Sequence, residues 1–210
     1  MYFQKDYVLR VIEQFGFFFR RLKEKLELTE QLKDLGAFSR EKIGMTPEAA
    51  LALKDETLNG LLDARAIFLL TEVLFILARL TEGKDPDRAG EIDLRTLRLL
   101  ASLHGEDELA AVRSGRLREL ACRLRDAMSP DDFLACARFF LNGGYYADTE
   151  DMVFLAAQTS DKAHRDYYVQ QGLALLYNMR VLPDDVLLPG GMSRQDIGES
   201  IADLKKMNLE

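Results

Sequence analysis

The sequence predicts an all-α fold, a multi-helix array that contains antiparallel helix pairs, and three observations predict it. Helix-start signals of one kind recur along the chain, as at Thr46-Pro47-Glu48 and Ser129-Pro130-Asp131. Glycines follow the expected helix ends, where they favour termination. Leu, Ala, Glu and Arg dominate the helical segments, and we find no run that alternates apolar and polar residues with Val, Ile and Thr as a half-buried strand does.

The first helix is expected over residues 5–27, because six apolar residues alternate at spacings of four and three. They are Val8, Ile12, Phe15, Phe19, Leu22 and Leu26. That spacing places all six on one stripe of a helix, which the rest of the chain must cover. We expect internal cover, and a homodimer remains an alternative. Residues 28–45 are expected to form a mixed connection with at most one short helical piece.

Later helix starts combine a short capping side chain, a proline in the first helical position and an acid that meets the positive end of the helix. Asp85-Pro86-Asp87 repeats this chemistry, and Ser193 with Asp196 forms a weaker, box-like start. The expected helices are 47–61, 64–81, 92–104, 107–127, 130–142, 146–158, 163–180 and 193–206.

Composition places the chain among ordinary globular proteins: 210 residues, 48% apolar and 30% charged, enough to bury a core without disulfides or metals. The net charge of −7 argues against a nucleic-acid partner. Seven arginines do gather in one region, at Arg95, Arg98, Arg113, Arg116, Arg118, Arg123 and Arg125. Because acids are interspersed among them, we interpret this region as a solvated face with ion pairs.

No membrane span is expected, because the most apolar stretch, Ala66 to Ala78, contains Glu72 and is shorter than the roughly twenty apolar residues that a span needs. This stretch is predicted to be a buried core helix. The N-terminus has charges where a signal peptide needs an apolar run, so the expected location is the cytoplasm.

The helix pair after Pro130 resembles a tetratricopeptide repeat. The small, aromatic and glycine positions of that motif correspond to Ala137, Phe140, Gly144, Tyr146, Val153 and Ala156, whereas Thr149 stands where the family prefers alanine. A second pair is expected to begin near His164, with Gly172 as its small crossing residue, and residues 183–191 interrupt it. The resemblance implies a groove for a peptide; the alternative is a hairpin that packs only within its own domain.

The N-terminal run from Phe3 to Glu13 also resembles the opening of a family of uncharacterised Firmicutes proteins with an FQxDYxxRxIE-like start. That family is similar in its long first helix and in a tetratricopeptide-like C-terminal part with a Gly-Leu-Ala-Leu-Leu helix, here Gly172 to Leu176. The resemblance implies a fold and a bacterial, cytoplasmic setting, and it implies no activity.

We predict no catalytic residue, no metal ligand and no cofactor. The two histidines, His104 and His164, form no zinc motif, and no nucleophile elbow or phosphate loop is present. Asp148, Glu150 and Asp151 are interpreted as helix-start acids, and Tyr167 and Tyr168 as helix-packing residues. Cys122 and Cys136 are predicted to be buried free thiols. These assignments leave binding as the expected chemistry.

The sequence thus leaves two functional hypotheses. The preferred one divides the chain into an N-terminal helical part, 1–129, and a tetratricopeptide-like part, 130–210, which pack tightly as one unit and act as a helical-repeat adaptor for a protein or peptide. The alternative is a small helical enzyme or ligand-binding protein with a pocket near Glu72, where a buried ionisable group would be functional.

Overall fold

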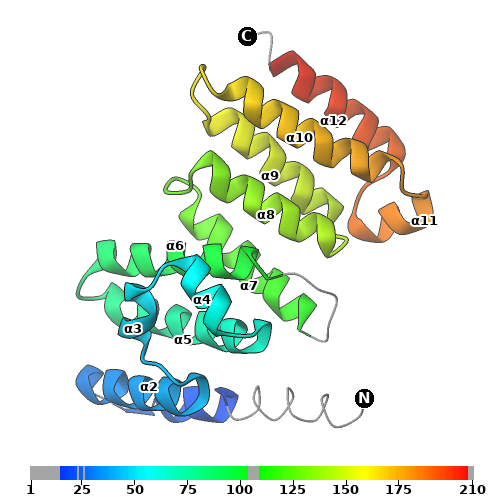
Figure 1. Ribbon diagram of the computed structural model, residues 1–210. Coiled ribbons are helices and arrows are strands. Elements are labelled where there is room, and N and C mark those ends of the chain that lie inside the picture. Colours follow the sequence, from blue (N-terminus) through cyan, green and yellow to red (C-terminus); the bar gives the residue numbers. More distant parts are fainter. Residues whose placement is uncertain (1–14, 23, 26, 104–108, 208–210) are drawn as a thin grey trace. The chain divides into compact units, whose positions relative to one another are not determined.

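A computed structural model describes residues 15–22, 24–25, 27–103 and 109–207, and it confirms the all-α multi-helix array (Figure 1). No strand occurs among these residues. The chain forms two compact units, Met1–Ile92 and Asp93–Glu210, so the division falls inside helix α6, Pro86–Ala101. The expected division after residue 129 rests on helix pattern and stays a prediction. Val8, Ile12, Leu26, the N-terminal motif, His104 and Gly105 lie outside the described residues.

In the first unit, the expected connection over 28–45 is wrong, because helix α2 occupies Leu28–Ile43. The helix lacks the start signal on which the prediction relied, although Gly44 ends it in the left-handed conformation. Glu27 precedes it without a side-chain cap, and Gly36 interrupts its pattern. Packing contacts with the rest of the chain therefore stabilise α2, because its own sequence favours a helix only weakly. The ring of Phe38 lies 4.3 Å from that of Phe18 and 5.9 Å from that of Phe15, so α2 packs against the first helix, while Phe15 and Phe19 of the stripe are half-buried.

The single helix expected over 47–61 is also wrong, since it divides into α3, Pro47–Ala52, and α4, Asp55–Leu61. Lys54 has extended backbone between them, which breaks the helical run. Helix α5, Ala64–Glu82, agrees closely with the prediction and is buried along most of its length. Helices α2, α3 and α4 all pack against it. The apolar stretch is therefore a core helix, as predicted.

All four helix starts for which the sequence predicts a capping residue are capped. The N–H of Ala49 donates to Thr46 Oγ1 (3.3 Å), and the N–H of Arg88 donates to Asp85 Oδ1 (3.0 Å). Ser129 with Asp132 and Ser193 with Asp196 form reciprocal boxes. The predicted start at residue 92 is wrong, because α6 begins at Pro86. The buried apolar residues of α6 begin only at Ala89, four residues after the capping residue Asp85.

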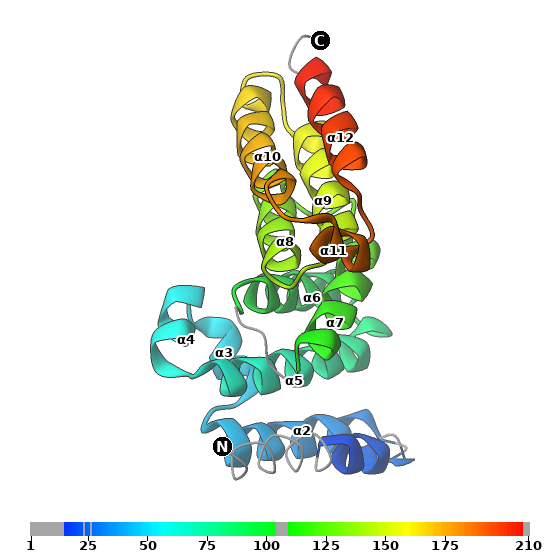
Figure 2. The same ribbon diagram turned by 90° about the vertical axis from the view of Figure 1, so that its right-hand side faces the viewer.

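The second unit contains two stacked helix pairs. Helices α8, Pro130–Asn142, and α9, Tyr146–Thr159, form one, and α10, Arg165–Arg180, and α12, Arg194–Met207, form the other. Figure 2 shows α8 and α10 in one layer and α9 and α12 in the next. Helix α7, Ala110–Leu124, precedes them. The core between the pairs includes Val153, Val169, Leu176 and Leu204, all fully buried.

The residues that suggested a repeat lie in this core. Ala137, Phe140, Val153 and Ala156 are fully buried. A Cβ on Gly172 would clash with Val153 Cγ1, so only glycine permits this approach of α10 to α9. Thr149 is also fully buried, and its hydroxyl donates to the carbonyl of Tyr145 (2.9 Å). That bond satisfies the polar group where the motif prefers alanine.

The interruption after α10 is an ordered insertion that the sequence left unassigned. It contains α11, Asp184–Leu187, and a 3-10 turn, η1, Leu188–Gly190. Leu187 and Met192 anchor it in the core. A Cβ on Gly190 would clash with the carbonyl of Gly144 and the ring of Tyr146, so the insertion packs directly against the turn between α8 and α9.

Candidate functional site

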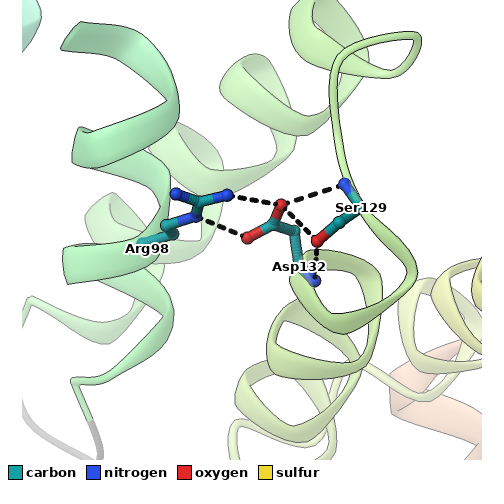
Figure 3. Close-up of polar contacts among 3 residues, drawn as sticks. All are labelled: Arg98, Ser129 and Asp132. Carbon is teal, nitrogen blue, oxygen red and sulfur yellow. Dashed lines mark hydrogen bonds and ion pairs between the residues drawn. The ribbon is translucent and has the colours of Figure 1, made fainter. Parts of the chain in front are cut away.

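An arginine network joins the helices that precede the stacked pairs to those pairs. Arg98 of α6 donates twice to Asp132 of α8, Nε to Oδ1 (2.7 Å) and Nη2 to Oδ2 (3.1 Å). Asp132 also accepts from the Ser129 backbone N–H (2.9 Å) and hydroxyl (2.7 Å), as Figure 3 shows. Burial alone would raise the pKa of Asp132, but the hydrogen bonds from Arg98 and Ser129 outweigh it and hold this pKa below its ordinary value. The pair is structural.

Two further arginines of α7 bridge helices in the same way. Arg118 pairs with Asp148 of α9 (2.6 Å) and its guanidinium lies 4.6 Å from the centre of the Tyr145 ring, while Arg123 pairs with Asp93 (3.2 Å). The predicted ion pairs are therefore confirmed. The solvated face is wrong in part, because Asp93 is 1% exposed and Arg113 only 3%. These pairs join α6, α7, α8 and α9 to one another.

One exposed surface of the second unit, which we name the α8–α10 face, spans two neighbouring helices. Its members recur at spacings of four, three and four along each helix, and each is exposed or half-buried. They are Asp131, Ala135, Arg138 and Asn142 on α8, with Tyr167, Gln171, Ala174 and Asn178 on α10. Such a spacing places each set on one side of its helix.

Two hydrogen bonds join α8 to α10 at this face. The Tyr168 hydroxyl donates to Asp131 Oδ1 (3.1 Å), and Arg138 Nη2 donates to Gln171 Oε1 (3.0 Å). Partial burial, together with the nearby charge of Asp131, raises the pKa of Tyr168. The Tyr167 ring stands edge-to-face against that of Tyr168, 5.1 Å between centroids, and is 54% exposed. Helix packing is therefore confirmed for Tyr168, whereas Tyr167 projects into solvent.

The remaining candidates are dispersed. His164 is exposed and pairs with Asp161 (2.9 Å), as expected of a surface histidine. Glu150 accepts a hydrogen bond from Ser200 of α12 and so joins two helices. Cys136 is buried as predicted, but Cys122 is exposed, because it lies on the outward side of α7. In the part of the chain that the structure describes, no three His, Cys, Asp or Glu residues group as a metal site requires.

Glu72, the centre of the alternative hypothesis, lies within α5 and is 8% exposed. It has an interaction partner, so it is not the isolated carboxylate that would favour a pocket. Helices α2, α3 and α4 pack against α5, the helix that contains Glu72. The ligand-binding alternative stays a prediction without a specific observation in its favour.

Comparisons with protein-family models, with curated proteins and with solved structures found no match. The described helices include none that combines the length and apolarity of a membrane span. The class of the protein therefore rests on its structure alone, which is an all-α array with two stacked helix pairs.

Proposed function

We propose that this chain is a helical-repeat adaptor that binds a protein or peptide partner on the α8–α10 face. The observation that carries the proposal is the matched pair of stripes. Two neighbouring helices present side chains at the same 4-3-4 spacing, and two interhelix hydrogen bonds hold them together. Stacked helix pairs commonly use such a repeated surface for binding.

The composition of the face suits a peptide. It combines an acid, a base, two asparagines, a glutamine and an exposed tyrosine, so it offers hydrogen-bond donors and acceptors to a peptide backbone. Tyrosine and arginine are the residue types that most often dominate binding energies at interfaces. Because the buried core fixes both helices, the face loses little conformational freedom when a partner binds.

The setting that we propose with this function is the bacterial cytoplasm. The resemblance of the N-terminal run to the Firmicutes family supports it, and that resemblance is also the reason to search for the partner among bacterial proteins. Self-association through other surfaces is compatible with the proposal, because the face belongs to a single chain.

Affinity capture tests the proposal. Wild-type protein and Arg138→Glu would be used to capture proteins from a bacterial lysate, with Lys206→Glu as the matched control on α12. Arg138 lies on the face, whereas Lys206 pairs with Asp203 of its own helix. We expect a partner that wild type and Lys206→Glu retain and Arg138→Glu loses, because this substitution removes the hydrogen bond from Arg138 to Gln171 that joins α8 to α10. Equal recovery by all three proteins would contradict the proposal, provided that their circular dichroism spectra agree.

A further inference from the structure

The predicted repeat part of the chain carries most of its net negative charge. Residues 130–210 contain thirteen Asp and Glu against seven Lys and Arg, a formal net charge of −6 within a total of −7. A charge imbalance of this size attracts cationic partners and raises their association rate. The binding surface of this part should therefore contain a group that can receive a cation.

Asp131 is such a group. Its side chain is exposed, and Tyr168 donates the only side-chain hydrogen bond that it receives among the described residues. None of the described Lys, Arg or His residues forms an ion pair with it. The nearest base on its own stripe, Arg138, lies two turns away and donates to Gln171. Asp131 Oδ2 is thus available to a second donor.

Tyr167 supplies an aromatic surface that is joined to this carboxylate through Tyr168. Its ring contacts the Tyr168 ring edge-on, and Tyr168 in turn contacts Asp131, so the three side chains form a continuous row across α10 and α8. With 54% of the residue exposed, part of the Tyr167 ring is accessible. A cation attracted to an aromatic face must approach within about 6 Å of the ring centre.

We infer that the partner of the α8–α10 face is a basic peptide segment, and that an arginine or lysine side chain of this segment binds against Asp131 and Tyr167. This inference rests on the proposed function and specifies its partner. A guanidinium suits the site best, because it can donate to a carboxylate while its plane stacks on an aromatic ring. A lysine ammonium could pair with the carboxylate but has no planar group to stack on the ring.

The probes for the test are N-acetyl-arginine methylamide and N-acetyl-citrulline methylamide, which have similar shapes and differ in charge. Each would be titrated into the full chain, labelled with ¹⁵N, while backbone amide shifts are recorded. We expect saturable shifts around residues 131 and 164–168 with the arginine probe, and a dissociation constant at least about fivefold lower than for the citrulline probe. Asp131→Asn should abolish this difference, and Tyr167→Ala should weaken binding of the arginine probe.

Two control variants separate the site from general surface effects. Asp203→Asn removes an exposed acid of α12, and Tyr177→Ala removes a tyrosine of α10 that is 42% exposed and already lies 5.7 Å from the Lys205 ammonium. Both should leave the titration unchanged. Equal binding of the two probes, or an Asp131→Asn variant that still prefers arginine, would overturn the inference.

The two proposals fail in different ways. If Arg138→Glu loses a captured partner while the probes bind equally, the face binds a partner and the inference about its charge is wrong. If the arginine probe binds as expected but no partner depends on Arg138, the cation site exists and the adaptor function is wrong.

Discussion

At the scale of single residues, Gly172 gives the sharpest test of the packing between the two helix pairs. Gly172→Ala places a methyl group against Val153 Cγ1 and Leu204 Cδ2, so we expect it to destabilise the protein by about 1–3 kcal/mol. Gly198→Ala is the matched control, because no neighbour lies within 4 Å of a Cβ there. It should stabilise the protein by about 0.4–1 kcal/mol through the unfolded state. Urea unfolding curves measure whether the free energy of unfolding falls in Gly172→Ala and rises in Gly198→Ala.

Asp132 links stability to pH. Its folded pKa lies below the ordinary value of 3.8, so its contribution is present above that value and is lost as the pH falls through the folded pKa. Asp132→Asn should lower the free energy of unfolding at pH 7 by about 1–2 kcal/mol, and the difference from wild type should shrink in acid. Urea unfolding at several pH values measures this.

The control for that experiment is Asp196→Asn, since Asp196 caps α12 through Ser193 and has no arginine partner among the described residues. Its effect should be smaller. Equal effects of the two substitutions would show that the Arg98 ion pair contributes nothing beyond the cap.

The two thiols should react very differently. Burial raises the pKa of Cys136 to about 12, whereas Cys122 is exposed. Only the thiolate attacks a disulfide reagent, so native protein at pH 8 should release about one equivalent of thionitrobenzoate quickly and the second only on unfolding. Cys122→Ser should remove the fast phase. A fast phase that persists in this variant would contradict the burial of Cys136.

At the scale of elements, the sequence predicted those helices that carry their own signals. Capped starts at Thr46, Asp85, Ser129 and Ser193 all proved correct, since a cap is a local interaction that residue types specify. Helix α2 has no such cap, and its helical state depends on contacts with the preceding helix. Local sequence patterns do not predict a helix that is stabilised mainly by contacts with other parts of the folded chain.

Removal of one ring tests that explanation of α2. Phe38 is 9% exposed and stacks on Phe18, so Phe38→Ala should cost about 3–5 kcal/mol and reduce the helical signal. Phe17→Ala is the control, because Phe17 is 66% exposed and should change stability little. Light scattering on both variants would also show whether a second copy covers the stripe. A change of mass in Phe17→Ala would indicate such a dimer.

At the scale of the whole molecule, the sequence predicted the fold class but only part of the candidate site. Gly172 was identified as a crossing residue from its spacing, and the structure places it where α10 approaches α9. The α8–α10 face was not predicted residue by residue. Tyr168 and Asp131 are 37 positions apart, and their contact depends on how the two pairs stack. The 4-3-4 exposed stripes were the available signal, because the same spacing recurs on both helices.

The central claim is that the α8–α10 face binds a partner, and site-specific photocrosslinking tests it most directly. A benzophenone amino acid would replace Ala135 or Ala174 on the face, or the exposed Ala202 on α12 as the matched control. The account predicts a discrete crosslinked product in cells from the first two positions and none from the third. Crosslinking from Ala202 alone, or equally from all three positions, would contradict it.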